Sequence, residues 1–317
     1  MKNARALLII PYFGTLGPWF PLYIRSLSRQ STLDLLLISD DTPAWLPDNA
    51  RRLEMSLSDF RTLAQQKIGS AVKLPTARHL CDLKPAYGHI FHDYLEEYDY
   101  WAFGDEDVLY GDVDRLLSPL LDGAVDVISP DQRMTVGHLT VLRNRNEVNK
   151  LALDDPIYLD ILSSGEFTAY DECSWARGIP DFSSFTKVVQ AAEARGDVRV
   201  RWGFPIRGDI PWPGTGIVYN GKSIHTLAGE ELVYFHWGRA KMRCRRFPSL
   251  FRFPDAEEAE RGFAYDRFGV YNPGSFFGCE QMRTTLRTFN NSRVGRSAER
   301  AVLAIGRAIA RLEQRTS

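Results

Sequence analysis

Apolar runs alternate with helix-like segments through the first hundred residues of the chain. Residues 6–11 and 35–38 are continuous apolar runs, as expected for strands that are covered on both faces. Apolar residues recur at helical spacing over residues 19–27 and 57–68. This repeated order of strand and helix predicts an α/β fold, in which a mostly parallel sheet is flanked by helices on both sides.

The pattern of apolar and polar positions predicts further elements along the chain. Ser56 is the expected N-cap of the helix over residues 57–68, with Asp59 in the capping-box position. Residues 85–98 place their apolar side chains on one helical face, and Pro85 suits the first turn of such a helix. We expect further strands over residues 100–103, 125–129, 138–142 and 232–236, and further helices over residues 187–195 and 291–317.

The same pattern divides the chain into three parts. Residues 1–241 are expected to form one α/β domain, although the pattern becomes irregular and rich in Gly, Pro and Trp from about residue 198. Residues 242–290 form a basic, irregular segment that we expect to pack on this domain. Residues 291–317 form a separate, basic amphipathic helical pattern.

The composition of the chain argues against several kinds of partner and cellular location. The formal net charge of -1 gives no overall field that would attract nucleic acid, so nucleic acid is not expected as a partner. The four cysteines are widely spaced and form no CxxC pair, which argues against a zinc site and favours a reduced, cytoplasmic protein. The apolar run at residues 6–10 is too short for a signal peptide and ends at Pro11. No apolar stretch approaches the roughly 20 residues that a membrane span needs.

The acidic triplet Asp105-Glu106-Asp107 directly follows the aromatic strand expected over residues 100–103. Because residues i and i+2 of an extended chain point to the same side, Asp105 and Asp107 can face one ligand while Glu106 faces away. Two neighbouring carboxylates repel each other and are stabilised by a cation between them. Oxygen ligands favour Mg²⁺ or Mn²⁺, which leave coordination positions for substrate phosphates. The alternative is a solvated acidic turn.

A strand followed by Asp-x-Asp resembles the signature of nucleotide-sugar transferases of the GT-A fold. The chain also resembles a mostly uncharacterised bacterial family of GT-A-like proteins from polysaccharide gene clusters. This resemblance covers most of residues 6–241 and rests on residues 82–88, 98–101, 104–112, 126–129, 137–144 and 170–172. It implies a glycosyltransferase that transfers a sugar from a UDP- or GDP-sugar to a glycan or a lipid-linked glycan acceptor.

The resemblance also implies roles for the metal side of the site. In related GT-A enzymes the last aspartate of the motif binds the metal and the first contacts ribose or metal, which implies these roles for Asp107 and Asp105. Many retaining members carry a late His-x-x-Gly-x-x-Lys, in which the histidine binds the metal and the lysine binds the diphosphate. Here the corresponding residues are His236, Gly238 and Lys241, with one residue fewer between His and Gly. A histidine with structural hydrogen bonds at a strand end is the alternative for His236.

On the sugar side, the acidic pair Asp171-Glu172 is expected to face the donor sugar. One of the two acts as a general base if the enzyme inverts, or stabilises the anomeric centre if it retains the configuration. The alternative is a helix N-terminus whose acids complement the helix dipole. His138 is expected to reach the donor sugar, because its strand is expected beside the acidic triplet.

On the nucleotide side, Asp82 and Lys84 are expected to lie near the nucleotide. Tyr12 or Phe13, in the loop after the first strand, is expected to stack on the base. An aromatic core residue is the alternative for that position.

The basic amphipathic helix over residues 291–317 has two interpretations. It can lie on an anionic membrane surface, which would place the protein peripherally at the inner face of the cell membrane and near a lipid-linked acceptor. Alternatively, its apolar face packs on its own domain or on the second subunit of a homodimer, and this is the interpretation we favour.

Two other functions fit parts of the sequence. A sugar-1-phosphate nucleotidyltransferase shares the broad architecture but needs a basic, glycine-rich loop after the first strand, whereas residues 12–20 contain no Lys or Arg. A non-catalytic carbohydrate-binding protein could use the seven tryptophans to stack on sugars. Such a protein would not need Asp105 and Asp107 at a strand end.

Overall fold

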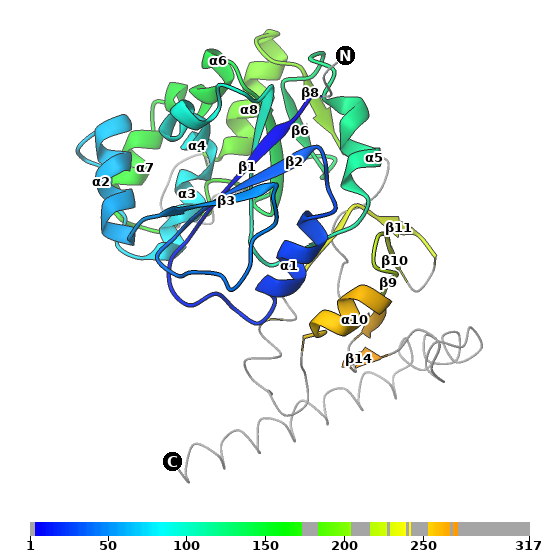
Figure 1. Ribbon diagram of the computed structural model, residues 1–317. Helices are drawn as coiled ribbons and strands as arrows, with labels where there is room; N and C mark the ends of the chain where they lie inside the picture. Colours follow the sequence, from blue (N-terminus) through cyan, green and yellow to red (C-terminus); the bar gives the residue numbers. More distant parts are fainter. Residues whose placement is uncertain are drawn as a thin grey trace, which may run out of the picture. The chain divides into compact units, whose positions relative to one another are not determined.

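The computed structural model describes residues 4–172, 183–203, 216–226, 229–238, 241, 253–266 and 269–271 (Figure 1). The chain divides into two compact units. Unit 1 comprises residues 1–17, 27–106 and 113–207, and unit 2 comprises residues 18–26, 107–112 and 208–317. The division falls inside the acidic triplet, since Asp105 and Glu106 end a segment of unit 1 and Asp107 begins a segment of unit 2.

Unit 1 contains a seven-stranded sheet with the order β3-β2-β1-β4-β7-β6-β8. The strands are β1 (Ala6–Tyr12), β2 (Leu33–Ser39), β3 (Ala50–Glu54), β4 (Tyr100–Gly104), β6 (Val127–Ser129), β7 (Leu139–Arg143) and β8 (Val200–Trp202). Only β7 runs antiparallel to its neighbours β4 and β6, and the other pairs of this sheet are parallel. The predicted α/β fold with a mostly parallel sheet is therefore confirmed.

Most helices of unit 1 contribute to one apolar cluster with the sheet. Phe60 and Tyr87 from two helices lie in the same buried cluster as Leu7 and Ile9 of β1. Leu8 is also fully buried, so both faces of β1 are covered, as its continuous apolar run predicts. The helices are α2 (Leu57–Lys67), α3 (Leu80–Leu83), α4 (Tyr87–Ile90), α5 (Val113–Leu117), α6 (Asn146–Asn149), α7 (Tyr158–Ser164) and α8 (Phe185–Arg195). Between them lie the 3₁₀ turns η1 (Ala77–His79), η2 (Lys84–Ala86), η3 (His92–Tyr94), η4 (Ser118–Leu120) and η5 (Leu151–Asp154).

Some of these helix boundaries agree with those predicted from local sequence signals, and others do not. The capping box of α2 is present, with Ser56 accepting from the Asp59 N–H and Asp59 accepting from the Ser56 N–H. The single helix expected over residues 85–98 is wrong, because this segment consists of η2, α4 and η3. Gly88 of α4 packs against the Trp101 ring, where a Cβ would come within 2.3 Å of that ring. This tertiary contact is not visible in the apolar periodicity.

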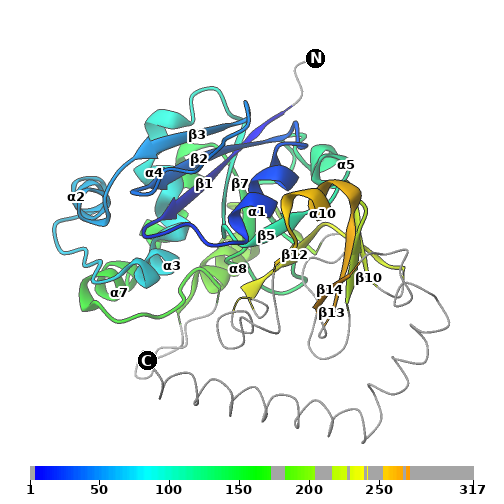
Figure 2. The same ribbon diagram turned by 60° about the horizontal axis from the view of Figure 1, so that its bottom comes forward.

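Unit 2 is built mainly from short antiparallel strands. Its five-stranded sheet has the order β11-β10-β9-β13-β14, and β12 pairs separately with β5. The strand expected over residues 232–236 is interrupted at Val233 and forms β11 and β12. The elements are α1 (Phe20–Leu27), β5 (Val108–Tyr110), β9 (Ile217–Tyr219), β10 (Ile224–Thr226), β11 (Glu231–Leu232), β12 (Tyr234–His236), α10 (Ala256–Arg261), β13 (Phe263–Asp266) and β14 (Gly269–Tyr271) (Figure 2).

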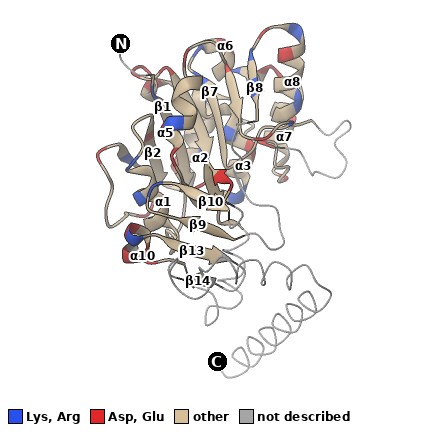
Figure 3. Cartoon of the chain, turned by 90° about the vertical axis from the view of Figure 1, so that its right-hand side faces the viewer, with Lys and Arg blue, Asp and Glu red and all other residues tan. Residues whose placement is uncertain are grey.

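The core of unit 2 is aromatic. Trp237 is fully buried and lies edge-on to Phe235, Phe253 and Tyr265, with ring centroids 4.9–5.3 Å away. Apart from β3, charged residues are sparse on the strands of both units, and the strands labelled in Figure 3 appear largely tan. Burial of these apolar side chains is the main favourable term in the folding of each unit.

Some expectations concern residues outside the described part of the chain. The basic segment after Lys241 lies largely outside it, and the amphipathic helix expected over residues 291–317, with its membrane and homodimer interpretations, lies wholly outside it. The boundaries at residues 241 and 290 stay predictions. No helix among the described residues is long and apolar enough to span a membrane. Of the four cysteines only Cys81 is described, and it is not in a disulfide.

Candidate active site

The acidic triplet follows β4, as the sequence predicts, and it is followed by β5, which the sequence does not predict. β4 ends at Gly104, which pairs with Leu139 at the start of β7. A Cβ on Gly104 would lie 3.1 Å from the His138 carbonyl oxygen, so glycine allows the close approach of the two strands. Asp105 follows immediately, at the carboxyl end of β4, where open α/β sheets bind their ligands.

Within unit 2, the carboxylate of Asp107 lies between the side chains of His236 and Lys241. Its carboxylate is 2% exposed, with Oδ1 at 3.2 Å from His236 Nε2 and Oδ2 at 2.6 Å from Lys241 Nζ. Burial by itself raises the pKa of Asp107, but His236 and Lys241 outweigh it and hold this pKa well below its usual range. Asp107 is therefore an ionised, buried carboxylate.

Strand pairing explains why His236 meets Asp107 although 129 positions separate them in sequence. β12 pairs antiparallel with β5, which places His236 opposite Val108, the neighbour of Asp107. The Trp237 N–H also donates to the Asp107 carbonyl oxygen at 2.8 Å. A Cβ on Gly238 would come within 2.8 Å of the His236 ring, so a glycine here leaves room for the imidazole.

Lys241 has a second contact in unit 2. Its Nζ lies 4.5 Å from the centre of the Trp19 ring, a cation–π geometry. The Lys241 N–H donates to the Trp237 carbonyl oxygen at 2.8 Å, which fixes the backbone from which the side chain reaches Asp107. Trp19 is a contact that the sequence does not reveal, because no local pattern connects it with residue 241.

Within unit 1, Lys84 joins Asp105 to the acidic pair at residues 171–172. Its Nζ lies 2.6 Å from Asp105 Oδ1, 2.9 Å from the Gly137 carbonyl oxygen and 3.1 Å from Asp171 Oδ2. The Lys84 side chain is 7% exposed. An ammonium group has three N–H donors, so these three acceptors account for all of them. The sequence predicts Lys84 near the nucleotide, and the structure places it between two carboxylates of unit 1.

The charges around Lys84 shift its pKa and that of Asp171. Burial lowers the pKa of Lys84, but the carboxylates of Asp105 and Asp171 outweigh it, and the pKa lies well above its usual value. Burial raises the pKa of Asp171 to about 7, with Lys84 opposing the shift and Glu172 adding to it. Such perturbed carboxylates are common at functional sites.

The raised pKa of Asp171 predicts a pH-dependent stability. An acid whose pKa is raised by folding contributes stability that is full below its unfolded pKa, about 3.9, and is lost as the pH rises through about 7. Asp171→Asn removes this titration. We therefore expect the free energy of unfolding of the variant, minus that of wild type, to rise as the pH increases from 4 to 7, by at most about 1.4 kcal/mol per pH unit. Urea denaturation of both proteins in EDTA over this range measures the difference. A difference that stays flat, or falls with pH, contradicts the shift.

Backbone contacts hold Asp171 and Glu172. The hydroxyl of Thr135 donates to the Asp171 carbonyl oxygen at 2.7 Å, and that of Thr186 donates to the Glu172 carbonyl oxygen at 2.6 Å. Glu172 Oε1 accepts the Gly137 N–H at 2.7 Å. Asp171 is 3% exposed, whereas Glu172 is half-buried and thus the more accessible acid. Neither threonine is suggested by the sequence, since both come from distant segments.

The predicted site residue Asp82 is buried in unit 1. Its carboxylate accepts hydrogen bonds from the Thr168 N–H and hydroxyl and from the Tyr170 N–H. These donors belong to the loop that leads into Asp171. The structure therefore places Asp82 beside the acidic pair, and its predicted contact with the nucleotide stays a prediction.

The aromatic residues after β1 differ in their surroundings. Phe13 packs on the core with its ring edge-on to Phe60 at 5.8 Å. Tyr12 is half-buried and its hydroxyl donates to the Thr15 carbonyl oxygen at 3.0 Å. Of the two, Tyr12 is the more available for stacking on a base. His138 directly precedes β7 and is half-buried; its strand lies beside β4, as predicted.

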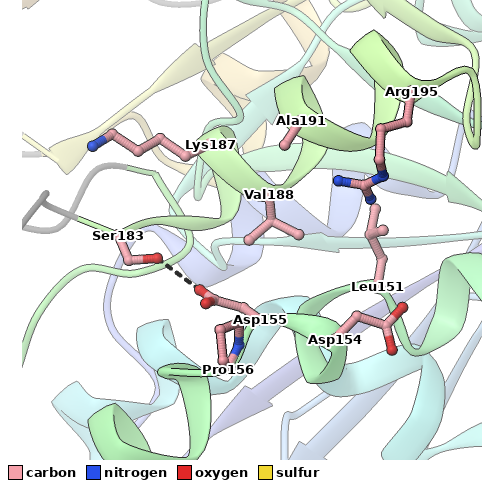
Figure 4. Close-up of a pocket in the computed structure, with 9 residues that line it drawn as sticks. All are labelled: Leu151, Asp154, Asp155, Pro156, Ser183, Lys187, Val188, Ala191 and Arg195. Atoms are coloured by element: carbon pink, nitrogen blue, oxygen red, sulfur yellow. Dashed lines mark hydrogen bonds between the residues drawn. The ribbon is translucent and has the colours of Figure 1, made fainter.

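A cavity of about 250 Å³ lies in unit 1 between η5 and α8 (Figure 4). None of the predicted site residues lines it. Asp155 on its wall accepts hydrogen bonds from Ser183 and from the Tyr170 hydroxyl. The cavity is lined by Leu151, Asp154, Asp155, Pro156, Ser183, Lys187, Val188, Ala191 and Arg195.

Asp105, Asp107 and His236 form a group that could hold a metal ion, because one ligand atom of each lies within 4.8 Å of the others. Asp107 and His236 belong to unit 2, and the chain links Asp107 to Asp105 through the single residue Glu106. Carboxylate oxygens suit Mg²⁺ and Mn²⁺, and an imidazole nitrogen suits transition metals. The carboxylate of Asp107 is ionised and buried, and with the Asp105 carboxylate and the His236 imidazole it offers the kinds of donor atom that a divalent cation takes.

A family comparison identifies relatives of the chain. The model of the family described as "Family of unknown function (DUF6625)" matches residues 8–201. The chain belongs to this family. The matched range includes Asp82, Lys84, Asp105, Asp107 and the pair Asp171-Glu172, whereas His236 and Lys241 lie beyond it. None of the curated proteins compared with the chain matches it.

Solved structures of two glycosyltransferases are among those similar to this family member. The apo-form glycosyltransferase GlyE of Streptococcus pneumoniae TIGR4 is 12% identical, with a TM-score of 0.34, over 63% of this chain and 45% of that chain. The galactosyltransferase LgtC in complex with donor and acceptor sugar analogs is 10% identical, with a TM-score of 0.31, over 52% of this chain and 70% of that chain. TM-scores below 0.5 do not establish a shared fold, so function is argued below from the residues.

Proposed function

We propose that the protein is a metal-dependent glycosyltransferase that transfers a sugar from a nucleoside-diphosphate sugar to a glycan or lipid-linked glycan acceptor. The observation that carries this proposal is the buried Asp107 carboxylate, which directly follows a strand end and contacts His236 and Lys241. A non-catalytic carbohydrate-binding protein would not need a buried, ionised carboxylate with a histidine and a lysine beside it.

Asp107, His236 and Asp105 are the proposed metal ligands. A bound Mn²⁺ or Mg²⁺ would supply Lewis acidity that neutralises the leaving diphosphate. The imidazole ligand shifts the expected preference from Mg²⁺ towards Mn²⁺. Lys241 lies beside Asp107, so we assign its ammonium group to a diphosphate oxygen, where a charge-assisted hydrogen bond is strong.

The acidic pair of unit 1 is assigned to the sugar side. Glu172 is the more accessible acid, and we assign it to accept the proton of the attacking acceptor hydroxyl. In that step the acceptor oxygen forms a bond to the anomeric carbon, the bond from this carbon to the diphosphate oxygen breaks, and the diphosphate leaves with the electron pair. Asp171 contacts Lys84 and has a pKa near 7, so its role is to hold Lys84 and the loop. The general-base catalysis assigned to Glu172 typically increases the rate about 10²–10⁴-fold.

The loop after β1 argues against a sugar-1-phosphate nucleotidyltransferase. Such an enzyme needs backbone N–H groups that are available to phosphates. Here the Gly14 N–H donates to Asp40 at 2.8 Å and the Leu16 N–H donates to Asp41 at 2.9 Å. Two acids already satisfy these donors and would repel a phosphate.

A ligand panel tests the proposed class directly. We expect UDP or GDP to raise the melting temperature by several degrees with Mn²⁺ and by little without it, because a ligand that binds the folded state stabilises it by about 2.7 kcal/mol at 100 times its Kd. Differential scanning fluorimetry with UDP, GDP, ADP and CMP, each with Mn²⁺ or EDTA, gives the comparison. Equal shifts in Mn²⁺ and EDTA would contradict a metal-bridged diphosphate.

A further inference from the structure

The loop that leads into the acidic pair has an unusual backbone. In the described part of the chain, Ala169 is the non-glycine residue with a left-handed conformation, at φ 54°. A side chain makes this region costly, and residues held in it cluster at functional sites. Ala169 lies two residues before Asp171, so its conformation sets the direction in which the acidic pair leaves the loop.

The Asp82 carboxylate holds Ala169 from both sides. It accepts the N–H of Thr168 at 3.2 and 3.3 Å, the hydroxyl of Thr168 at 2.8 Å and the N–H of Tyr170 at 2.9 Å. Asp82 is 3% exposed, so these bonds form away from water, where hydrogen bonds are strong. The two N–H groups that flank Ala169 thus converge on one carboxylate.

Tyr170 and Tyr158 fix the far side of the same loop. Their rings stack with centroids 4.5 Å apart at 27°, and the Tyr170 hydroxyl donates to Asp155 at 2.7 Å. The Tyr158 hydroxyl donates to the backbone carbonyl oxygen of Asp82 at 2.8 Å. Helix α3, helix α7 and the loop are therefore tied together around Asp82.

We propose that Asp82 is a positioning residue, which locks Ala169 in the left-handed conformation and so directs Glu172 towards the reacting sugar. This inference rests on the proposed function and assigns Asp82 no contact with the donor. It is argued from the burial of Asp82 and from the four hydrogen bonds that its carboxylate accepts from the loop.

Asp82→Asn tests the proposal, because the amide keeps the shape but loses the charge and half of the acceptors. We expect kcat to fall about 100-fold, the loss typical when a catalytic group is misplaced by about 1 Å. The donor KM and the Mn²⁺–UDP melting shift should change less than twofold. A donor KM raised tenfold or more with unchanged kcat would place Asp82 at the nucleotide and overturn the proposal. Asp160→Asn, at an exposed acid of α7, is the matched control and should match wild type.

A second variant separates positioning from general destabilisation. Glycine adopts a positive φ without steric cost, so Asp82→Asn/Ala169→Gly should recover at least tenfold of the lost kcat. No recovery in the double variant would mean that the conformation of Ala169 is not what Asp82 controls.

Hydrogen exchange gives a readout that does not depend on transfer activity. Mass spectrometry of the peptide covering residues 168–172 should show faster exchange at the Thr168 and Tyr170 amides in Asp82→Asn than in wild type. Unchanged exchange refutes the clamp even if the enzyme is an active transferase. If wild type transfers no sugar, the proposed function fails, while faster exchange in Asp82→Asn would still establish Asp82 as the clamp of this loop.

Discussion

Asp107→Asn is expected to reduce Mn²⁺-dependent transfer about 10³-fold. The substitution keeps the shape and one acceptor for His236 but removes the charge that balances the cation. Metal-ion stabilisation of a leaving group is worth several kcal/mol, and about 4 kcal/mol corresponds to this loss in rate. The measurement is nucleotide release from the donor sugar found in the ligand panel, together with Mn²⁺ binding followed by isothermal titration calorimetry.

The matched control is Asp112→Asn, which neutralises an acid five residues further on. Asp112 lies 3.6 Å from the exposed Lys222, and such a surface pair contributes little. This variant should keep its transfer rate within twofold of wild type. Full Mn²⁺-dependent turnover in Asp107→Asn, with a cooperative melting transition, would refute the metal role of Asp107.

Lys84→Met is expected to lower the free energy of unfolding by about 3–5 kcal/mol, the cost of removing one partner from a buried ion pair. Asp105, Asp171 and the Gly137 carbonyl would all lose their shared donor. Urea denaturation at pH 8 measures the change. The stability of the variant should rise as the pH falls, because protonation removes the unpaired charge on Asp171.

Two further variants control this experiment. Lys67→Met makes the same substitution at an exposed pair with Asp93, and should cost less than about 1 kcal/mol. Lys84→Met/Asp171→Asn should be more stable than Lys84→Met alone, since the second change removes a buried charge without a partner. If Asp171→Asn changes the free energy of unfolding by the same amount in Lys84→Met as in wild type, Lys84 and Asp171 are not coupled in the folded protein.

The sequence predicts the elements whose signals are local. The apolar run of β1 and the capping box of α2 are found where they were expected, because burial and capping depend on residues close together in the chain. β3 was missed, since its sequence Ala-Arg-Arg-Leu-Glu carries little apolar pattern and its strand lies at the sheet edge. Tertiary pairing with β2 makes it a strand.

For the candidate site, the sequence identifies the candidate residues, and the structure shows which other residues they contact. Asp105, Asp107 and His236 stand out in the sequence through strand ends and motif resemblance. The contacts of Lys84 with Asp171 and of Asp82 with residues 168–170 join positions more than 80 apart. No periodicity encodes such contacts, because they depend on how the helices pack on the sheet.

The sequence by itself therefore determined the α/β class, the positions along the chain of β1, β2, β4, β6 and β7, and the acidic triplet at the end of β4. These features follow from apolar burial and from the local geometry of an extended chain. Only the tertiary structure decided that β7 runs antiparallel, that β12 brings His236 to Asp107, and that Asp82 contacts a loop. The physical reason is that buried polar groups need hydrogen-bond partners. These partners come from distant parts of the sequence, so they are determined only when the chain folds.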